Sequence, residues 1–506
     1  MTLSYSYDGY NDPAGLTDSL GGKVSYSYNA DQMLTGLTLS LNQFPEASVT
    51  LGYDAANRLT GQTLKAGSHL GTDTLTSSYS YDNANELTNI TYKDVTKSLT
   101  LANYTYSYTG GELTGYQDNS GNSLTYGYDV NGELTSATRT LNSSNYTLIY
   151  NYDLNGNRTS TSTDVNGSLT SATYSTGAGN EMTSDGMYSF TYDNVGNMAS
   201  QTNISTGYVT YYSWDHRNRL IEVKQEDNHA NVLNDEKFTY DVNNNRIAVS
   251  LNGTTQLYTV FDGANPYMDF NGSGTLTQRY LTNPNALSQF YGQVSASGTT
   301  QWFLTDNIDS IRQVVSTGGS VLDAITYDPY GNIVNQTNSA NAPRFLYTGG
   351  AYDLNTGNYQ FDARTYSPND GRFESQDSLS FRAGDTDLYR YGYNNPMIHY
   401  DPSGLDYKNT KPEHVKPAED AKKKLKGKGK EPIVINKDNL DAFLKQVPQG
   451  SYFKFVITKD GKLIAGIWYP GSRDGFEHIM LPPKVGDNVN AAGRGQVVDA
   501  GAKKLR

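Results

Sequence analysis

The chain has 506 residues, which predicts either two to four domains or a repeat array that grows without adding cores. It contains no cysteine, which excludes disulfides, thiolate metal sites and nucleophilic cysteine chemistry. The net charge of −13 is unevenly divided, because residues 1–405 hold 19 Lys and Arg against 40 Asp and Glu, whereas residues 406–506 hold 20 against 12. An acidic body joined to a basic tail is expected if the body holds the tail, or if the tail binds a polyanion.

The start of the chain reads MTLSYSYDGYNDPAGL and lacks both the basic residues and the apolar stretch of a secretory signal. No apolar run reaches membrane-spanning length, so no stable membrane span is expected. Because the chain begins inside a repeat pattern, we expect the C-terminal part of a longer protein with any export signal upstream. A complete short gene is the alternative.

An internal repeat occupies the first half of the chain. Eleven units begin at intervals of 18 to 28 residues, at Tyr7, Tyr28, Tyr53, Tyr81, Tyr108, Tyr128, Tyr152, Tyr174, Tyr192, Trp214 and Tyr240. A typical unit reads YDAANRLTGQT, an aromatic residue and Asp, then an Asn or Gly turn, then an alternating strand. Alternation with period two predicts strands, and the Asn and Gly residues tolerate the positive φ of tight turns. Each unit is therefore predicted to be a β-hairpin.

Stacked hairpins would form one long sheet that pairs all but its terminal edges. Of the 42 tyrosines, 39 precede Asp406, and we interpret their rings as structural ladders, with a sugar- or peptide-binding surface as the alternative. Few apolar side chains are present for a thick core. We therefore expect a mainly β fold in which the sheet curls round with one face enclosing a space.

Four ordered segments follow the repeats: WFLTDNIDSIRQV (302–314), YDPYGNIV (327–334), FLYTGGAYDLNTGNYQFDARTYSPNDGRFESQD (345–377) and DLYRYGYNNPMIHYDPSGL (387–405). With the repeats, they resemble the RHS (rearrangement hot spot) or YD-repeat family of bacterial polymorphic toxins, which includes the C components of insecticidal toxin complexes. The resemblance implies a hollow shell of hairpins (1–300), a core segment that plugs it and contains a self-cleavage site (301–405), and an enclosed C-terminal toxin (406–506). It also implies a cut after the DPSGL motif, between Leu405 and Asp406.

The residues that the resemblance assigns to this cut are Asp377 and Asp401, an acid–base pair of the aspartyl type, with Arg364 as a cation for a carboxylate or the substrate carbonyl. Arg372 is expected to brace a turn. This chain departs from the family pattern at Ser378, Ser380 and Asp309, and we expect the first two to loosen the turn around Asp377 and to slow or prevent the cut. The alternative is that both aspartates only cap Asx turns.

Beyond residue 405, prolines and a lysine run predict a flexible basic linker over 406–432, for which a nucleic-acid contact is an alternative. A helix over 438–447 and a hairpin that turns at Asp460 and Gly461 predict a small α+β domain. No HExxH, HNH, P-loop or GxSxG pattern occurs, and we expect no metal and no cofactor.

The candidate toxin residues are His478, Glu477 and Arg494. A metal-independent nuclease needs a proton-transferring His, a second acid–base group and a cation, and the glycines around Arg494 would let backbone approach a phosphate. An ordinary loop histidine is the alternative for His478. An ADP-ribosylating or deaminating toxin is a further possibility, although the sequence has no cofactor loop or zinc ligand set for it.

Two hypotheses follow for the whole chain. In the first, a secreted or cell-surface protein releases a toxin, most simply a nuclease, into a competitor or host cell. Its partners are a cognate immunity protein, a secretion or delivery apparatus, and RNA or DNA as substrate. In the second, the protein is a secreted or cell-surface β-shell for adhesion or display, and its tail is an inert or truncated remnant.

Overall fold

The computed structural model describes residues 1–405 except 43, 68, 69, 71–73, 142, 143 and 384. Beyond 405 it describes strands at 408–409, 433–435, 452–458, 463–468, 489–499 and 504–505. The described part is almost entirely β-structure, which confirms the predicted class. It contains no α-helix, only short 3-10 turns: η1 (Ala178–Asn180), η2 (Ser339–Asn341), η3 (Tyr347–Gly349), η4 (Ser380–Ala383) and η5 (Gly392–Asn394).

The first sheet has 15 strands, each hydrogen-bonded antiparallel to the next along the chain. Its strands are β1 (Leu3–Tyr7), β2 (Pro13–Asp18), β3 (Gly22–Tyr28), β4 (Leu34–Leu41), β5 (Phe44–Tyr53), β6 (Leu59–Ala66), β7 (Thr74–Tyr81), β8 (Leu87–Asp94), β9 (Leu99–Thr109), β10 (Glu112–Asp118), β11 (Ser123–Tyr128), β12 (Leu134–Leu141), β13 (Ser144–Tyr152), β14 (Arg158–Val165) and β15 (Ser168–Thr173).

The second sheet has 16 strands in the same sequential order. They are β16 (Ser175–Thr176), β17 (Met182–Ser184), β18 (Tyr188–Tyr192), β19 (Met198–Asn203), β20 (Val209–Trp214), β21 (Leu220–Glu226), β22 (Val232–Tyr240), β23 (Arg246–Leu251), β24 (Thr254–Asp262), β25 (Asn265–Asn271), β26 (Leu276–Thr282), β27 (Phe290–Ser295), β28 (Thr300–Thr305), β29 (Ile311–Ser316), β30 (Val321–Tyr327) and β31 (Ile333–Gln336). The sheet continues across residue 300, so the predicted boundary there coincides with no break in strand pairing.

Smaller sheets follow. The strands β32 (Ala351–Tyr352), β33 (Tyr359–Gln360), β34 (Thr365–Ser367) and β35 (Arg372–Phe373) form one, and β36 (His399–Tyr400) pairs with β37 (Lys408–Asn409). Five strands form the last sheet, in the order β38 (Ile433–Ile435), β40 (Leu463–Trp468), β39 (Tyr452–Thr458), β41 (Val489–Asp499) and β42 (Lys504–Leu505). The antiparallel pairing of β39 with β40 confirms the predicted hairpin, although its turn at 460–461 and the predicted helix at 438–447 lie outside the described residues.

The aspartate of each repeat closes the hairpin turn. In the unit at Tyr53, Asp54 Oδ1 accepts the N–H groups of Ala56 (2.9 Å) and Arg58 (3.0 Å), and Asn57 has φ of 60°. In the unit at Tyr152, Asp153 makes the equivalent bonds while Gly156 takes the positive φ of 85°. The Asp and the Asn or Gly three residues later therefore act together as one local turn device.

In most of the repeats the aromatic residue joins one hairpin to the previous one. The Tyr53 hydroxyl donates to the Leu34 carbonyl (2.8 Å), and the Tyr152 hydroxyl donates to the Leu134 carbonyl (2.9 Å). Where the repeat has Trp214, the indole Nε1–H donates to the Met198 carbonyl (2.7 Å), so the exchange of ring keeps the bond. These contacts support the structural interpretation of the rings.

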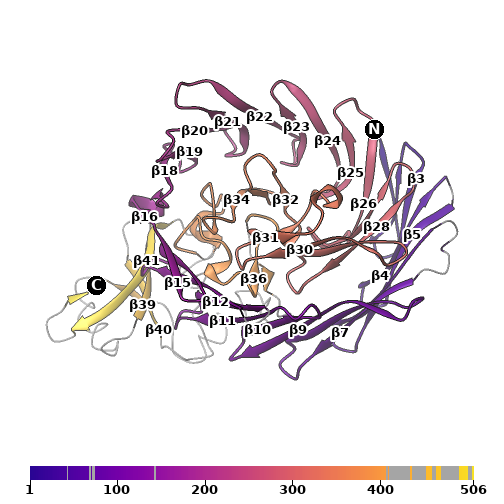
Figure 1. Ribbon diagram of the computed structural model, residues 1–506, viewed down its shortest axis with the longest axis horizontal. Coiled ribbons are helices and arrows are strands. Elements are labelled where there is room, and N and C mark those ends of the chain that lie inside the picture. Colours follow the sequence, from indigo (N-terminus) through magenta and orange to yellow (C-terminus); the bar gives the residue numbers. More distant parts are fainter. Residues whose placement is uncertain are drawn as a thin grey trace.

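The two sheets curve around the chain segment that follows them, and β32, β34 and β36 lie inside that curve (Figure 1). A buried ion pair joins the two sheets, because Asp18 at the end of β2 binds Arg279 of β26 at 2.8 Å and also accepts the Tyr267 hydroxyl. The inner segment is tied to the first sheet by the asparagines of its NNP motif. Asn394 donates to the Gly156 carbonyl (2.7 Å) and Asn395 to the Gly132 carbonyl (2.9 Å), both in repeat turns.

Within the described residues there is no helix of the length and apolar character needed to cross a bilayer.

Candidate functional site

Three of the predicted site residues come together inside the curved sheets. Arg364 immediately precedes β34, Asp377 follows β35, and Asp401 follows β36. All three are buried, with exposed fractions of 5%, 8% and 4%. Three short strands separated in sequence thus deliver one cation and two carboxylates to the same interior position.

The Arg364 guanidinium bridges the two carboxylates. Its Nη2 lies 3.0 Å from Asp377 Oδ2 and 3.2 Å from Asp401 Oδ2, so the two acids are close neighbours. Its Nη1 donates to the Leu388 carbonyl (3.1 Å), and its plane lies 3.6 Å from the centre of the Phe373 ring. The guanidinium is therefore held on both its polar edge and its apolar face.

The DPSGL turn packs directly against this arginine. Arg364 Nε donates to the Gly404 carbonyl, one residue before the predicted cut, rather than to the carbonyl of the scissile bond. Gly404 has φ of 65°, and a Cβ there would come within 2.9 Å of the Arg364 backbone nitrogen. Only glycine fits this position, so the motif lets the chain approach the guanidinium.

Each aspartate also caps a local turn, as the alternative interpretation expected. Asp377 Oδ1 accepts the Leu379 N–H (2.7 Å), while Asp401 Oδ1 accepts the Ser403 hydroxyl (2.8 Å) and the Leu405 N–H (3.2 Å). In both residues the second oxygen, Oδ2, contacts Arg364. Each aspartate therefore caps its turn with one oxygen and faces the Arg364 guanidinium with the other.

The surroundings of Asp377 shift its pKa toward neutrality. Burial raises the pKa of Asp377 to about 6, the charge of Asp401 adds to the rise, and Arg364 and the Leu379 N–H oppose it. A carboxyl with this pKa exchanges its proton near neutral pH, which suits a general acid or base.

The turn at Asp377, which the two serines are expected to loosen, is closed by a hydrogen bond in the structure. Ser380 adopts φ of 54°, and its N–H donates to the Asp377 carbonyl at 2.8 Å, so the turn closes without glycine. The other departure, Asp309, has φ of 62°, and its carboxylate accepts the Tyr400 hydroxyl (3.2 Å). Asp309 thereby supports the residue immediately before Asp401.

Arg372 braces its surroundings, as the sequence predicts. Its Nη2 donates to the Asn180 carbonyl (2.6 Å) in η1, and its guanidinium lies over the Tyr389 ring. In the described structure its carboxylate partner is Asp387, at 3.8 Å.

Other predicted site residues fall elsewhere. Leu405 is described, but Asp406, His478 and Glu477 lie outside the described residues, as does the lysine-rich linker except for 408–409. Arg494 lies in the middle of β41, in register with Lys454 of β39. Its neighbouring glycines belong to the same strand ladder, and the predicted approach of this backbone to a phosphate stays a prediction. The part of the chain that the structure describes contains no cluster of three or more potential metal ligands.

Sequence reasoning missed Ser403, Gly404 and Phe373 as parts of the site. The first two stand inside the DPSGL motif, which marked the cut but not its contacts. Phe373 adjoins Arg372, which the sequence predicts only as a brace for its turn. Its role as the platform for Arg364 depends on strand pairing between β34 and β35, which no local pattern specifies.

A strip of sequential β-hairpins, curved around its own C-terminal segment and carrying a buried Asp–Arg–Asp group there, defines a YD-repeat shell protein. The family model described as Teneurin YD-shell matches residues 112–397, more than half of the chain, and the chain belongs to this family. The resemblance seen in the sequence is thereby confirmed.

Two curated relatives are named as nucleases. The chain is 26% identical over 231 residues to the tRNA3(Ser)-specific nuclease WapA of Bacillus spizizenii and 27% identical over 239 residues to the tRNA nuclease WapA of Bacillus subtilis. Each match covers 44% of this chain but only 9% of the relative.

The fold is similar to that of solved toxin components. The crystal structure of TcdB2-TccC3 matches with a TM-score of 0.65 at 20% identity, covering 80% of this chain and 22% of that one. A Photorhabdus luminescens Tc holotoxin pore matches with a TM-score of 0.63 at 20% identity, covering 81% and 22%. At this identity the likeness concerns the fold alone.

Proposed function

We propose that this protein is a toxin-enclosing shell that cuts its own chain between Leu405 and Asp406 and so releases residues 406–506. The observation that carries the proposal is the bridge of Arg364 between Asp377 and Asp401, directly against the turn that precedes the cut. The curvature of both sheets around the inner segment supports the enclosing role (Figure 1).

In the proposed reaction, a water molecule attacks the Leu405 carbonyl carbon and one carboxylate accepts its proton. The protonated carboxyl of the pair donates to the leaving nitrogen of Asp406, so that a new carboxyl and a new amine form as the peptide bond breaks. Asp377, with its pKa near 6, is suited to donate, and Asp401 is suited to accept. Arg364 holds the Gly404 carbonyl and thereby fixes the chain next to the acids.

Intact-mass measurement of the purified full chain tests the cut. We expect fragments of 405 and 101 residues from the unaltered protein, and an uncut chain from Asp377→Asn or Asp401→Asn. Asp370→Asn is the matched control, because Asp370 is a buried acid of the same segment whose side chain bonds Ser367. An unaltered chain that stays whole, or an Asp377→Asn chain cut at the normal rate, rejects the proposal.

For the released part we propose nuclease activity. Its support is the excess of basic residues after 405 and the names of the two WapA relatives. Another relative, 25% identical over 249 residues, is named double-stranded DNA deaminase toxin A of Burkholderia cenocepacia, so base deamination is the competing chemistry.

Expression of residues 406–506 with and without His478→Ala separates the outcomes. Growth arrest with loss of tRNA in the intact version alone supports a nuclease that uses His478, whereas DNA mutation without RNA loss supports a deaminase. Harmless expression of both versions supports an inert tail. The nuclease proposal implies secretion or surface display by the producing cell, a delivery apparatus, and an immunity protein that protects the producer.

A further inference from the structure

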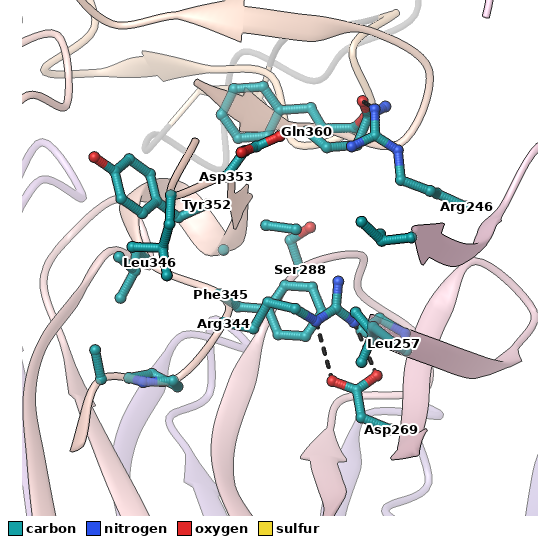
Figure 2. Close-up of a pocket in the computed structure, with 18 of the residues that line it drawn as sticks. Arg246, Leu257, Asp269, Ser288, Arg344, Phe345, Leu346, Tyr352, Asp353 and Gln360 are labelled. Atoms are coloured by element: carbon teal, nitrogen blue, oxygen red, sulfur yellow. Dashed lines mark hydrogen bonds and ion pairs between the residues drawn. The ribbon is translucent and has the colours of Figure 1, made fainter. Parts of the chain in front are cut away.

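A cavity of about 520 Å³ lies between the second sheet and the inner segment. One wall comes from β22 to β26 and the other from residues 339–362 (Figure 2). Most of its lining is apolar, and its aromatic members are Phe238, Phe261, Phe290, Phe345, Tyr352 and Phe361. Its volume is in the range of small-molecule sites, and its aromatic rings can face a cation.

Part of the charge in this cavity is already neutralised. Arg344 binds both oxygens of Asp269, with Nε to Oδ2 and Nη2 to Oδ1 each at 3.0 Å, as Figure 2 shows. Arg246 lies 3.7 Å from the centre of the Phe238 ring and donates to Gln360 Oε1 at 2.5 Å. Its Nε also donates to the Tyr240 hydroxyl (3.3 Å), so these three partners of Arg246 are neutral groups.

The remaining lining charges are acidic. The lining has three further acids, Glu236, Asp353 and Asp362, and only one further cation, Arg246. The cavity therefore carries an excess of negative charge when these acids are ionised. Burial raises the pKa of Asp362 to about 6, and the charge of Asp241 adds to the rise. An incoming anion would meet this excess, whereas a cation would offset it.

Glu236 of β22 supplies a specific partner for such a cation. It is 6% exposed, lines the cavity, and its Oε2 is buried with no hydrogen-bond partner among the described residues, while Asp353 and Asn355 interact with the same carboxyl group. A buried oxygen of this kind is costly to leave unpaired, because it has lost water without gaining a donor. Burial and the neighbouring Asp353 raise the pKa of Glu236 to about 7, with Asn355 and Arg246 acting against the rise.

We propose that this cavity binds an organic cation, a primary ammonium group carried on an apolar body. The ammonium group donates to Glu236 Oε2, and the apolar body lies among the aromatic side chains. A free amine has this chemistry, and so does a lysine flanked by apolar residues. Only the second source, a lysine of residues 406–506, rests on the proposed enclosure of that region.

The first experiment titrates the full chain with phenethylamine and with its neutral analogue 2-phenylethanol, by calorimetry. We expect the amine to bind and the alcohol to bind at least about tenfold more weakly, since the charge-assisted hydrogen bond is lost. Binding should tighten from pH 6 to pH 8 as Glu236, whose pKa burial raises to about 7, loses its proton. Glu236→Gln should weaken amine binding about tenfold or more, while Glu222→Gln, which does not line the cavity, should leave it unchanged.

The second experiment identifies an internal occupant by zero-length carbodiimide cross-linking of the full chain. A link from Glu236 to a lysine beyond 405, lost in Glu236→Gln, would show that the chain's own lysine fills the site and excludes added amine. The pair of Lys237 and Glu222, at 3.1 Å, reports that the reaction works.

Absence of both amine binding and a Glu236 link, with the Lys237 link present, overturns the proposal. Asp353→Asn gives a second variant if Glu236→Gln fails to fold. Intact mass of the same samples reports the cut at Leu405 separately, so failure of the enclosing shell and failure of the cation site are distinguishable.

Discussion

Replacing Arg364 by glutamine should be far more damaging than the loss of one ion pair. The guanidinium bridges two buried carboxylates at 3.0 and 3.2 Å and binds two backbone carbonyls. Removing one partner from a buried pair costs about 3–5 kcal/mol, because the remaining charge stays buried and uncompensated. We therefore expect Arg364→Gln to lower the free energy of unfolding by about 3–5 kcal/mol at pH 8.

The loss should shrink in acid. Burial raises the pKa of Asp377 to about 6 and Arg364 opposes the rise, so removal of the arginine raises this pKa further. A carboxyl whose pKa is higher when folded contributes stability that is complete below its unfolded value, near 3.8, and is lost as pH rises through the folded value. Each unit of pKa shift corresponds to about 1.4 kcal/mol, so the deficit should be much smaller at pH 5 than at pH 8.

Urea unfolding followed by tryptophan fluorescence measures the free energy of unfolding at each pH, since Trp302 is 1% exposed in the core. Chains ending at Leu405 remove any difference in cleavage. The control is Arg58→Gln, whose ion pair with Asp54 at 2.7 Å is about a quarter exposed and should contribute about 1 kcal/mol or less. The reasoning is refuted if both variants lose the same stability, or if the Arg364→Gln deficit does not change with pH.

Three further outcomes are expected. Tyr53→Phe removes the hydroxyl bond to the previous hairpin and should cost about 1 kcal/mol in urea unfolding, whereas Tyr7→Phe, at a side chain 56% exposed, should cost almost nothing. The rate of self-cleavage, followed by mass, should fall up to about tenfold per pH unit above pH 6 if protonated Asp377 is the donor; a flat profile would assign that role elsewhere. Ser380→Gly relieves a positive φ of 54° and should raise stability by about 1 kcal/mol without reducing cleavage, while Ser378→Gly, at a residue without positive φ, should not stabilise.

The sequence by itself determined the hairpin repeat, because the interactions that build it are local. The Asp turn closes within five residues, as Asp54 shows, and its positive φ falls on Asn57 or its equivalents. The aromatic bond reaches only the previous hairpin, from Tyr53 to Leu34. Period-two alternation and these short contacts recur in most units, so pattern reasoning succeeds there.

The candidate site was predicted from ordered motifs rather than from physical reasoning about spacing. Arg364 and Asp401 are 37 residues apart, and nothing in their local sequence states that they meet. The structure adds what the motifs left out, including the Phe373 platform and the closed turn at Ser380.

Tertiary structure alone decided where distant segments meet. Sheet curvature brings together residues that are distant in sequence. It accounts for the end of the first sheet at Thr173, for the ion pair of Asp18 with Arg279 across 261 residues, and for the position of Glu236 in a cavity beside Asp353. That curvature accumulates from small twists at every strand pair. No single repeat specifies the total curvature of the sheet. The contacts between distant segments therefore appear only when the whole strip of hairpins is folded.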